Sequence, residues 1–204
     1  MRLPALCEGL LRGTMLLPPS WLTARLHCRD ATDDDIPELL SALADSRDIA
    51  SMDPAFGAAS EAEIREHLER HRNGHGKVQM QVLHRRKPET SWESPAGCAG
   101  ADFVGFWRLV RVPEPADALG VEILLMRPEV RGQGLAHELM IGAKEILRGR
   151  AAELWARVYL ANARAMAFWT QSGLRRVVEH RGAFIHGLGG DDGPNLILAC
   201  NLSP

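Results

Sequence analysis

The sequence GVEILLMRPEVRGQGLA, residues 120–136, decides the fold of the chain around it. It begins with a nearly unbroken apolar run that stops at Pro128, and it ends in a short loop rich in glycine. Apolar residues then return at helical spacing, as Leu135, Leu139, Met140, Ala143 and Ile146. This pattern predicts a buried strand, a loop and an amphipathic helix in succession.

The loop from Arg131 to Ala136 places small residues where the helix begins. The first N–H groups of a helix have no partner within it, and the helix dipole makes that end positive. Since glycine lets a ligand approach the backbone closely, this helix end favours an anion such as a phosphate. A tight turn between strand and helix is the simpler alternative. The loop lacks the Gly-Lys-Ser/Thr of nucleoside triphosphate loops and the Gly-x-Gly-x-x-Gly of dinucleotide folds.

Two motifs resemble signatures of the GNAT superfamily of N-acetyltransferases, which use acyl-CoA. The first is Arg-x-x-Gly-x-Ala, residues 131–136, after a strand that ends Leu-Met-x-Pro-Glu. The second is Asn-x-x-Ala-x-x-Phe-Trp-x-x-x-Gly-Leu, residues 162–174, with an aromatic pair before a helix that ends at glycine. A strand ending Arg-Asp-Ala-Thr, followed by Asp-x-x-x-Leu-Leu, is similar to the start of many members. The resemblance spans about residues 23 to 202.

The resemblance implies an α/β fold with a mixed central sheet of about seven strands and helices on both faces. Alternating or apolar segments predict strands at 23–28, 78–83, 101–111, 120–126, 153–159, 175–186 and 195–202. Residues 1–22 show no sustained period, so we expect an N-terminal extension there and the GNAT-like domain over 23–204. The loops at 45–59, 85–100 and 187–194, where the acceptor pocket is expected, carry no readable motif.

Composition narrows the class of protein. A chain of 204 residues, 46% of them hydrophobic, suits one well-buried domain. Its net charge of −2 argues against nucleic-acid and membrane-surface partners, which select clustered positive charge. Glu8 and Arg12 interrupt the leucine-rich N-terminus before a signal peptide or membrane span can form.

Metal sites and disulfides are not expected. The four cysteines lie far apart without a Cys-x-x-Cys pair, so a reducing cytoplasm is the simplest setting. His67, His71 and His75 have a spacing that could hold a metal, but a solvated helix face is the favoured interpretation because no carboxylate or cysteine accompanies them.

The resemblance implies acetyl-CoA as co-substrate. The backbone of Leu124, Leu125 and Met126 would pair with the pantetheine arm as an added strand does. The N–H groups of the loop would hold the pyrophosphate, from Arg131, Gly132, Gln133, Gly134, Leu135 and Ala136. In the superfamily the arm lies where two strands splay apart, which would bring it close to Asn162 and Trp169. Asn162 could equally serve only as a helix cap.

Glu122 is the candidate general base. It is the one carboxylate within its apolar strand, and period-two alternation places it on the same face as Leu124 and Met126. A buried charge must be solvated or used, so the alternatives are an edge position facing solvent or an ion pair with an arginine such as Arg108.

At the position of the candidate general acid, this sequence differs from many members of the family. Many members carry a tyrosine where this chain has Trp169, and an indole cannot usefully protonate a thiolate. Tyr159 is the only tyrosine and ends the neighbouring strand, so it is the expected substitute, with water or Ser172 as alternatives.

The expected function is transfer of an acetyl group from acetyl-CoA to a primary amine of a small molecule or peptide. The alternative is a non-catalytic module of the same fold that binds acyl-CoA or regulates. The sequence does not identify the amine, and it leaves open whether the chain forms a homodimer.

Overall fold

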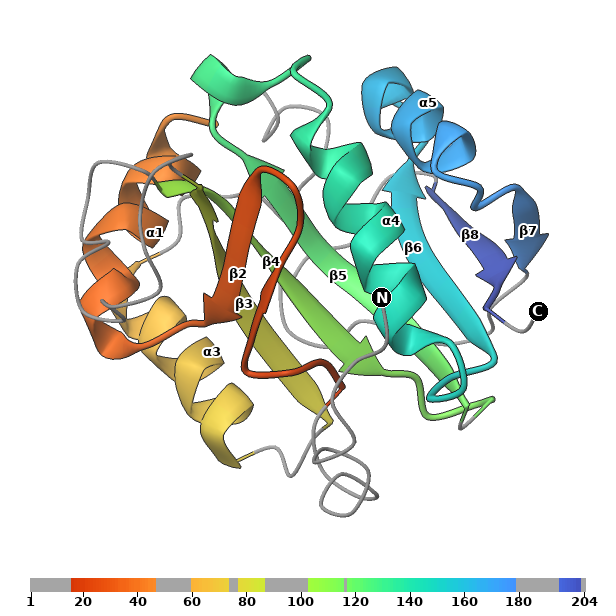
Figure 1. The fold of residues 1–204 in the computed structure, drawn as a ribbon, viewed down its shortest axis with the longest axis horizontal. Helices are drawn as coiled ribbons and strands as arrows, with labels where there is room; N and C mark the ends of the chain where they lie inside the picture. Colours follow the sequence, from red (N-terminus) through yellow and green to blue (C-terminus); the bar gives the residue numbers. More distant parts are fainter. Residues whose placement is uncertain are drawn as a thin grey trace.

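The computed structural model describes residues 16–46, 60–73, 77–86, 103–115, 117–178 and 195–202. Its centre is one eight-stranded sheet in the order β1-β2-β3-β4-β5-β6-β8-β7 (Figure 1). The strands are β1 Ser20–Leu22, β2 Leu26–Asp30, β3 Val78–Arg85, β4 Phe103–Arg111, β5 Ala118–Met126, β6 Glu153–Tyr159, β7 Arg176–Val178 and β8 Asn195–Asn201. Among them, β5 and β6 pair in parallel and all other neighbours are antiparallel. The expected mixed sheet is confirmed, with one strand more than about seven.

Helices cover both faces of this sheet, as expected (Figure 1). The helices are α1 Ile36–Ala44, α3 Glu61–Asn73, α4 Leu135–Leu147 and α5 Ala163–Gln171, with short 3-10 turns η2 Asp33–Asp35 and η4 Pro128–Val130. On one face, α4 and α5 contribute Leu139, Met140 and Trp169 to the largest core cluster. On the other face, α1 and α3 contribute Leu39, Ile64 and Leu68 to a second cluster. The sheet therefore separates two cores.

The additional strand is β1, and it corrects the expected domain boundary. Its residues lie in the segment 1–22 that we expected outside the fold. Leu17 and Trp21 are buried, and their N–H groups donate to Gln79 Oε1 at 2.7 Å and to Gln81 Oε1 at 2.9 Å. Residues 16–22 are thus part of the domain, whereas residues 1–15 lie outside the described residues.

Polar side chains fix the start of α3 as its sequence suggests. Ser60 N–H donates to Glu63 Oε2 at 2.6 Å, and Glu63 N–H donates back to Ser60 Oγ at 3.3 Å. This reciprocal pair satisfies two N–H groups that the first turn leaves without partners.

The histidines of α3 do not form a solvated face. His67 is buried, and His71 Nδ1 accepts from Met80 N–H at 3.4 Å, while His75 lies outside the described residues. The described residues contain no cluster of three or more His, Cys, Asp or Glu able to hold a metal ion.

Several other expectations lie wholly or largely outside the described residues. They are the three acceptor loops and residues 179–186 of the strand expected over 175–186. None of the described helices is long and apolar enough to span a membrane.

Candidate active site

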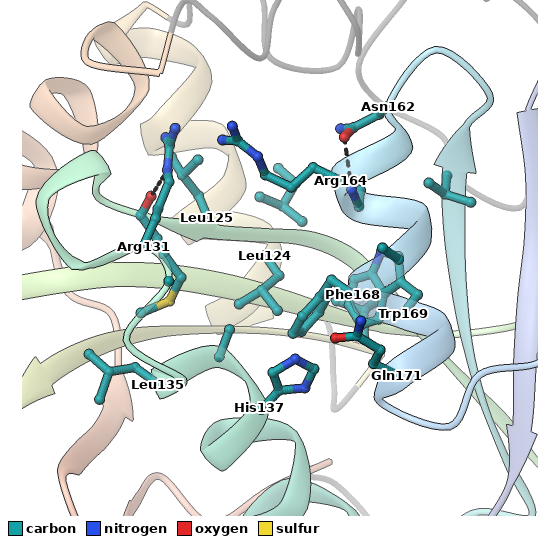
Figure 2. Close-up of a pocket in the computed structure, with 18 of the residues that line it drawn as sticks. Leu124, Leu125, Arg131, Leu135, His137, Asn162, Arg164, Phe168, Trp169 and Gln171 are labelled. Carbon is teal, nitrogen blue, oxygen red and sulfur yellow. Dashed lines mark hydrogen bonds between the residues drawn. The ribbon is translucent and has the colours of Figure 1, made fainter.

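A cavity of about 730 Å³ opens between β5, β6, α5 and the start of α4 (Figure 2). The last parallel pair of β5 and β6 joins Val121 to Ala156. Beyond it, β5 continues to Met126 and β6 to Tyr159 with no further pairing between the two strands. The strands therefore splay at their C-terminal ends, and β5 can offer main-chain groups to a ligand between them.

The loop at the mouth of the cavity contains two glycines with positive φ angles, a conformation that glycine favours. Gly132 and Gly134 have φ angles of 75° and 78°, in the left-handed region that residues with a Cβ rarely adopt. Gly134 caps α4, which begins at Leu135. Since α4 runs for 13 residues, its first N–H groups present a positive helix end.

Most of the expected donor-binding residues line the cavity. These are Leu124, Leu125, Met126, Arg131, Gly132, Gly134, Leu135, Ala136, Asn162 and Trp169. Gln133 is not among the described lining residues: its amide N–H donates to Glu129 O at 2.9 Å, and its Oε1 accepts from Arg85 Nη2 at 2.5 Å.

The Arg131 side chain has a structural task. Its Nε–H donates to Met126 O at 2.9 Å and its Nη2–H to Ser46 Oγ at 2.8 Å. These bonds tie the loop to the end of β5 and to the turn after α1. The loop glycines are therefore held in place from one side.

Of the two roles that the sequence left open for Asn162, the helix cap is confirmed, and contact with the donor stays a prediction. Its Oδ1 accepts from Ala165 N–H at 2.9 Å, which caps α5, and the residue also lines the cavity. Trp169 is buried at the cavity wall, where its ring packs edge-on against Phe168 with centroids 4.8 Å apart.

Glu122 sits on a β-bulge, which corrects the face predicted for it. Arg108 pairs with Ile123 and Leu109 pairs with Val121, so Glu122 is the extra residue. After the bulge, Leu124 and Met126 face the α4 cluster. Glu122 instead forms an ion pair with Arg108, on the α3 side of the sheet. The ion-pair alternative is confirmed, and Glu122 also lines the cavity.

The ion pair is buried, and the described groups that act on its charges include Arg70 and His67. The side chains of Arg108 and Glu122 are 2% and 4% exposed. Burial lowers the pKa of the Arg108 guanidinium, and the charge of Glu122 opposes that effect. Burial, followed by the charges of Arg108 and Arg70, lowers the pKa of His67 to about 4, so His67 is neutral at pH 7.

Tyr159 is buried but is not among the described residues that line the cavity. Its ring lies 5.2 Å from the guanidinium carbon of Arg157, which does line the cavity. Ser172, the alternative donor, has its hydroxyl 3.0 Å from Nδ1 of His137.

The sequence did not single out five polar or aromatic lining residues: His137, Arg157, Arg164, Phe168 and Gln171. Figure 2 shows Phe168 and His137 close together beside Leu124, and their ring centroids are 4.9 Å apart. The helical positions of Arg164 and Phe168 within the second motif could have indicated them, because spacings of three and four residues share a helix face.

The sequence model of the acetyltransferase (GNAT) family matches residues 57–174. The chain belongs to this family. Its match covers the splayed strands, the loop and both helices beside the cavity. No protein of curated function matches the chain.

Solved structures of acetyltransferases share the fold. An acetyltransferase from Thermus thermophilus is 19% identical with a TM-score of 0.64, over 88% of this chain and 97% of that one. A ribosomal L7/L12 alpha-N-protein acetyltransferase in complex with coenzyme A is 15% identical with a TM-score of 0.62, over 89% and 96%. The spermidine N-acetyltransferase of Vibrio cholerae, in complex with CoA and spermine, is 15% identical with a TM-score of 0.61, over 87% and 95%. Such low identities establish the fold alone.

Proposed function

We propose that this GNAT protein transfers an acetyl group from acetyl-CoA to a primary amine. The observation that carries the proposal is the splay of β5 and β6, with a glycine loop and helix start at one side and a buried carboxylate at the fork. In this scheme the donor's phosphates would bind at the loop, and proton transfer would take place at the fork.

The donor would lie along β5. The N–H groups of residues 131–136 at the start of α4 would hold the pyrophosphate, and the main chain of Leu124, Leu125 and Met126 would pair with the pantetheine arm. Asn162 and Trp169 would border the arm from α5, since both line the cavity beside the splayed strands. No metal has a role in this scheme.

The reaction requires one bond to form and one to break. The amine nitrogen attacks the thioester carbonyl carbon, and the carbon–sulfur bond then breaks to give the acetylated amine and a thiolate. Glu122 would accept the amine's proton, directly or through water, because this residue lines the cavity at the fork. Tyr159 remains our candidate to protonate the thiolate, and its position outside the described cavity lining would require a short movement or a bridging water.

The rival function is a module that binds acyl-CoA without using it. Trp169 in place of the family's tyrosine and the buried position of Tyr159 both favour this rival. Calorimetry with acetyl-CoA, followed by a thiol-release assay with a panel of amines, separates the two. The enzyme releases thiol only when an amine is present, whereas the module binds acetyl-CoA and releases none.

A further inference from the structure

Three charged side chains on neighbouring strands lie on the sheet face opposite α4. On β4, Arg108 alternates with Trp107 and Leu109, which pack in the α4 cluster. On β6, Arg157 alternates with Ala156 and Val158, which pack in the same cluster. Because side chains alternate along a strand, Arg108 and Arg157 both point away from α4. Glu122 joins them through its ion pair with Arg108.

Glu122 and Arg157 stand on opposite sides of the fork. They directly follow Val121 and Ala156, the last parallel pair of β5 and β6. Both residues line the cavity. The ring of Tyr159, 5.2 Å from the guanidinium carbon, steadies Arg157 by a cation–π contact. A glutamate and an arginine thus line the cavity from the two strands.

The charge of the described cavity lining is unsuited to a polycationic acceptor. Among the described lining residues, Glu122 is the one carboxylate, whereas Arg131, Arg157 and Arg164 bring guanidinium groups. The charge of Glu122 is already opposed by Arg108. A polyamine would bring further cations into this field, and like charges repel strongly where solvent is excluded.

An amine that carries a carboxylate within a few bonds brings a negative charge as well as a positive one, unlike a polyamine. Its carboxylate offsets the charge of its own ammonium, and that carboxylate can accept charge-assisted, bidentate hydrogen bonds from a guanidinium. The donor's phosphates do not account for Arg157, because in the proposed function they lie at residues 131–136 beside α4. Arg157 points to the other face of the sheet.

We infer that the acceptor is a small amine bearing a carboxylate near its amino group, as in an amino acid, and that Arg157 binds this carboxylate. The inference rests on the proposed function, since it assigns the acceptor half of the same cavity. It makes Arg157 a residue that determines specificity and leaves proton transfer to other groups.

The test compares each amino acid with its own carboxamide, which removes the negative charge at nearly constant size. In the thiol-release assay we expect kcat/KM of the wild type to be about 10- to 100-fold higher for the acid, the scale of a hydrogen bond to a charged group. Arg157→Gln should remove this preference mainly through KM, and Arg157→Lys should restore part of it. Arg65→Gln, an exposed arginine of α3, serves as the control and should preserve the preference.

Three results would overturn the inference. In the first, the wild type prefers carboxamides or polyamines. In the second, Arg157→Gln lowers kcat/KM equally for the acid and its carboxamide. In the third, Arg157→Gln weakens CoA binding, which would place Arg157 at the donor site. If the wild type turns over no amine, the proposed function fails instead. The inference is then judged by calorimetry of the amino acids against the CoA-loaded protein, where binding that Arg157→Gln weakens supports it and no binding overturns it.

Discussion

At the scale of single residues, the face of the sheet to which Glu122 points is the feature that the sequence predicted wrongly. Period two placed Glu122 beside Leu124 and Met126, but the bulge at Glu122 moves its carboxylate to the other face. A bulge adds one residue to one strand of a pair, so the signal lies in the register of two strands and not in either sequence alone. The apolar strand and its single carboxylate could nevertheless be predicted from the sequence.

Glu122→Gln tests the proposed base. In the folded variant we expect turnover to fall by roughly 10² to 10⁴-fold, with little change in acetyl-CoA affinity, because the amide cannot accept the proton. The variant leaves Arg108 buried without its counter-charge, so its folding is measured first. Steady-state kinetics and calorimetry measure the two effects. A variant with wild-type turnover across a pH series would show that Glu122 is a bystander.

Arg108→Gln tests the ion pair as a structural unit. Removing the cation leaves a buried carboxylate uncompensated, which should lower the free energy of unfolding by about 3 to 5 kcal/mol. The double variant with Glu122→Gln should recover much of this loss, because no buried charge then remains. Urea unfolding of both variants measures the difference, and equal stability of the two would contradict the assignment.

Tyr159→Phe and Trp169→Phe test the proposed acid. If Tyr159 protonates the thiolate, its variant loses kcat strongly with little change in folding, since one hydroxyl is removed. Trp169→Phe should raise the Michaelis constant more than it lowers kcat, because the indole supplies contact area at the cavity wall. The reverse pattern would refute the assignment, and two unaffected variants would leave solvent as the proton donor.

At the scale of elements, the strand, loop and helix of residues 118–147 were readable because apolar period and glycine position agree. The fork between β5 and β6 was expected from the resemblance, and the structure shows where it begins. β1 was missed because three residues are too short for a visible period, and two prolines precede it. Its place is set by pairing with β2 and by contacts with Gln79 and Gln81.

Gly134→Glu tests the loop as the site of the donor. The added carboxylate should abolish CoA binding, because it repels the pyrophosphate and fills its place. Gly149→Glu is the matched control: Gly149 has a φ of 77°, so it suffers similar backbone strain, but it lies after the other end of α4. Calorimetry should show lost affinity in the first variant and wild-type affinity in the second. Equal CoA affinities in the two folded variants would show that the loop does not bind the donor.

At the scale of the whole molecule, the segment from residue 16 to residue 22 belongs to the core on the α4 side of the sheet. Trp21 is buried and lies 6.4 Å from Trp107 between ring centroids, whereas Leu22 on the other face of β1 is 42% exposed. We expect Trp21→Ala to lower the free energy of unfolding by about 3 to 5 kcal/mol. Leu22→Ala should change it by less than about 0.5 kcal/mol. Urea unfolding measures both free energies. Similar losses in the two variants would show that β1 does not belong to the core.

The central claim is that acetyl transfer takes place at the fork between β5 and β6. The most direct measurement follows acetyl-CoA, CoA and the acetylated amine together by mass spectrometry, with wild type and Glu122→Gln at equal concentration. We predict that the wild type forms CoA and acetylated amine in equal amounts, and that Glu122→Gln forms both far more slowly while binding acetyl-CoA normally. Acetyl-CoA that is bound by the wild type and remains intact with every amine would contradict the account.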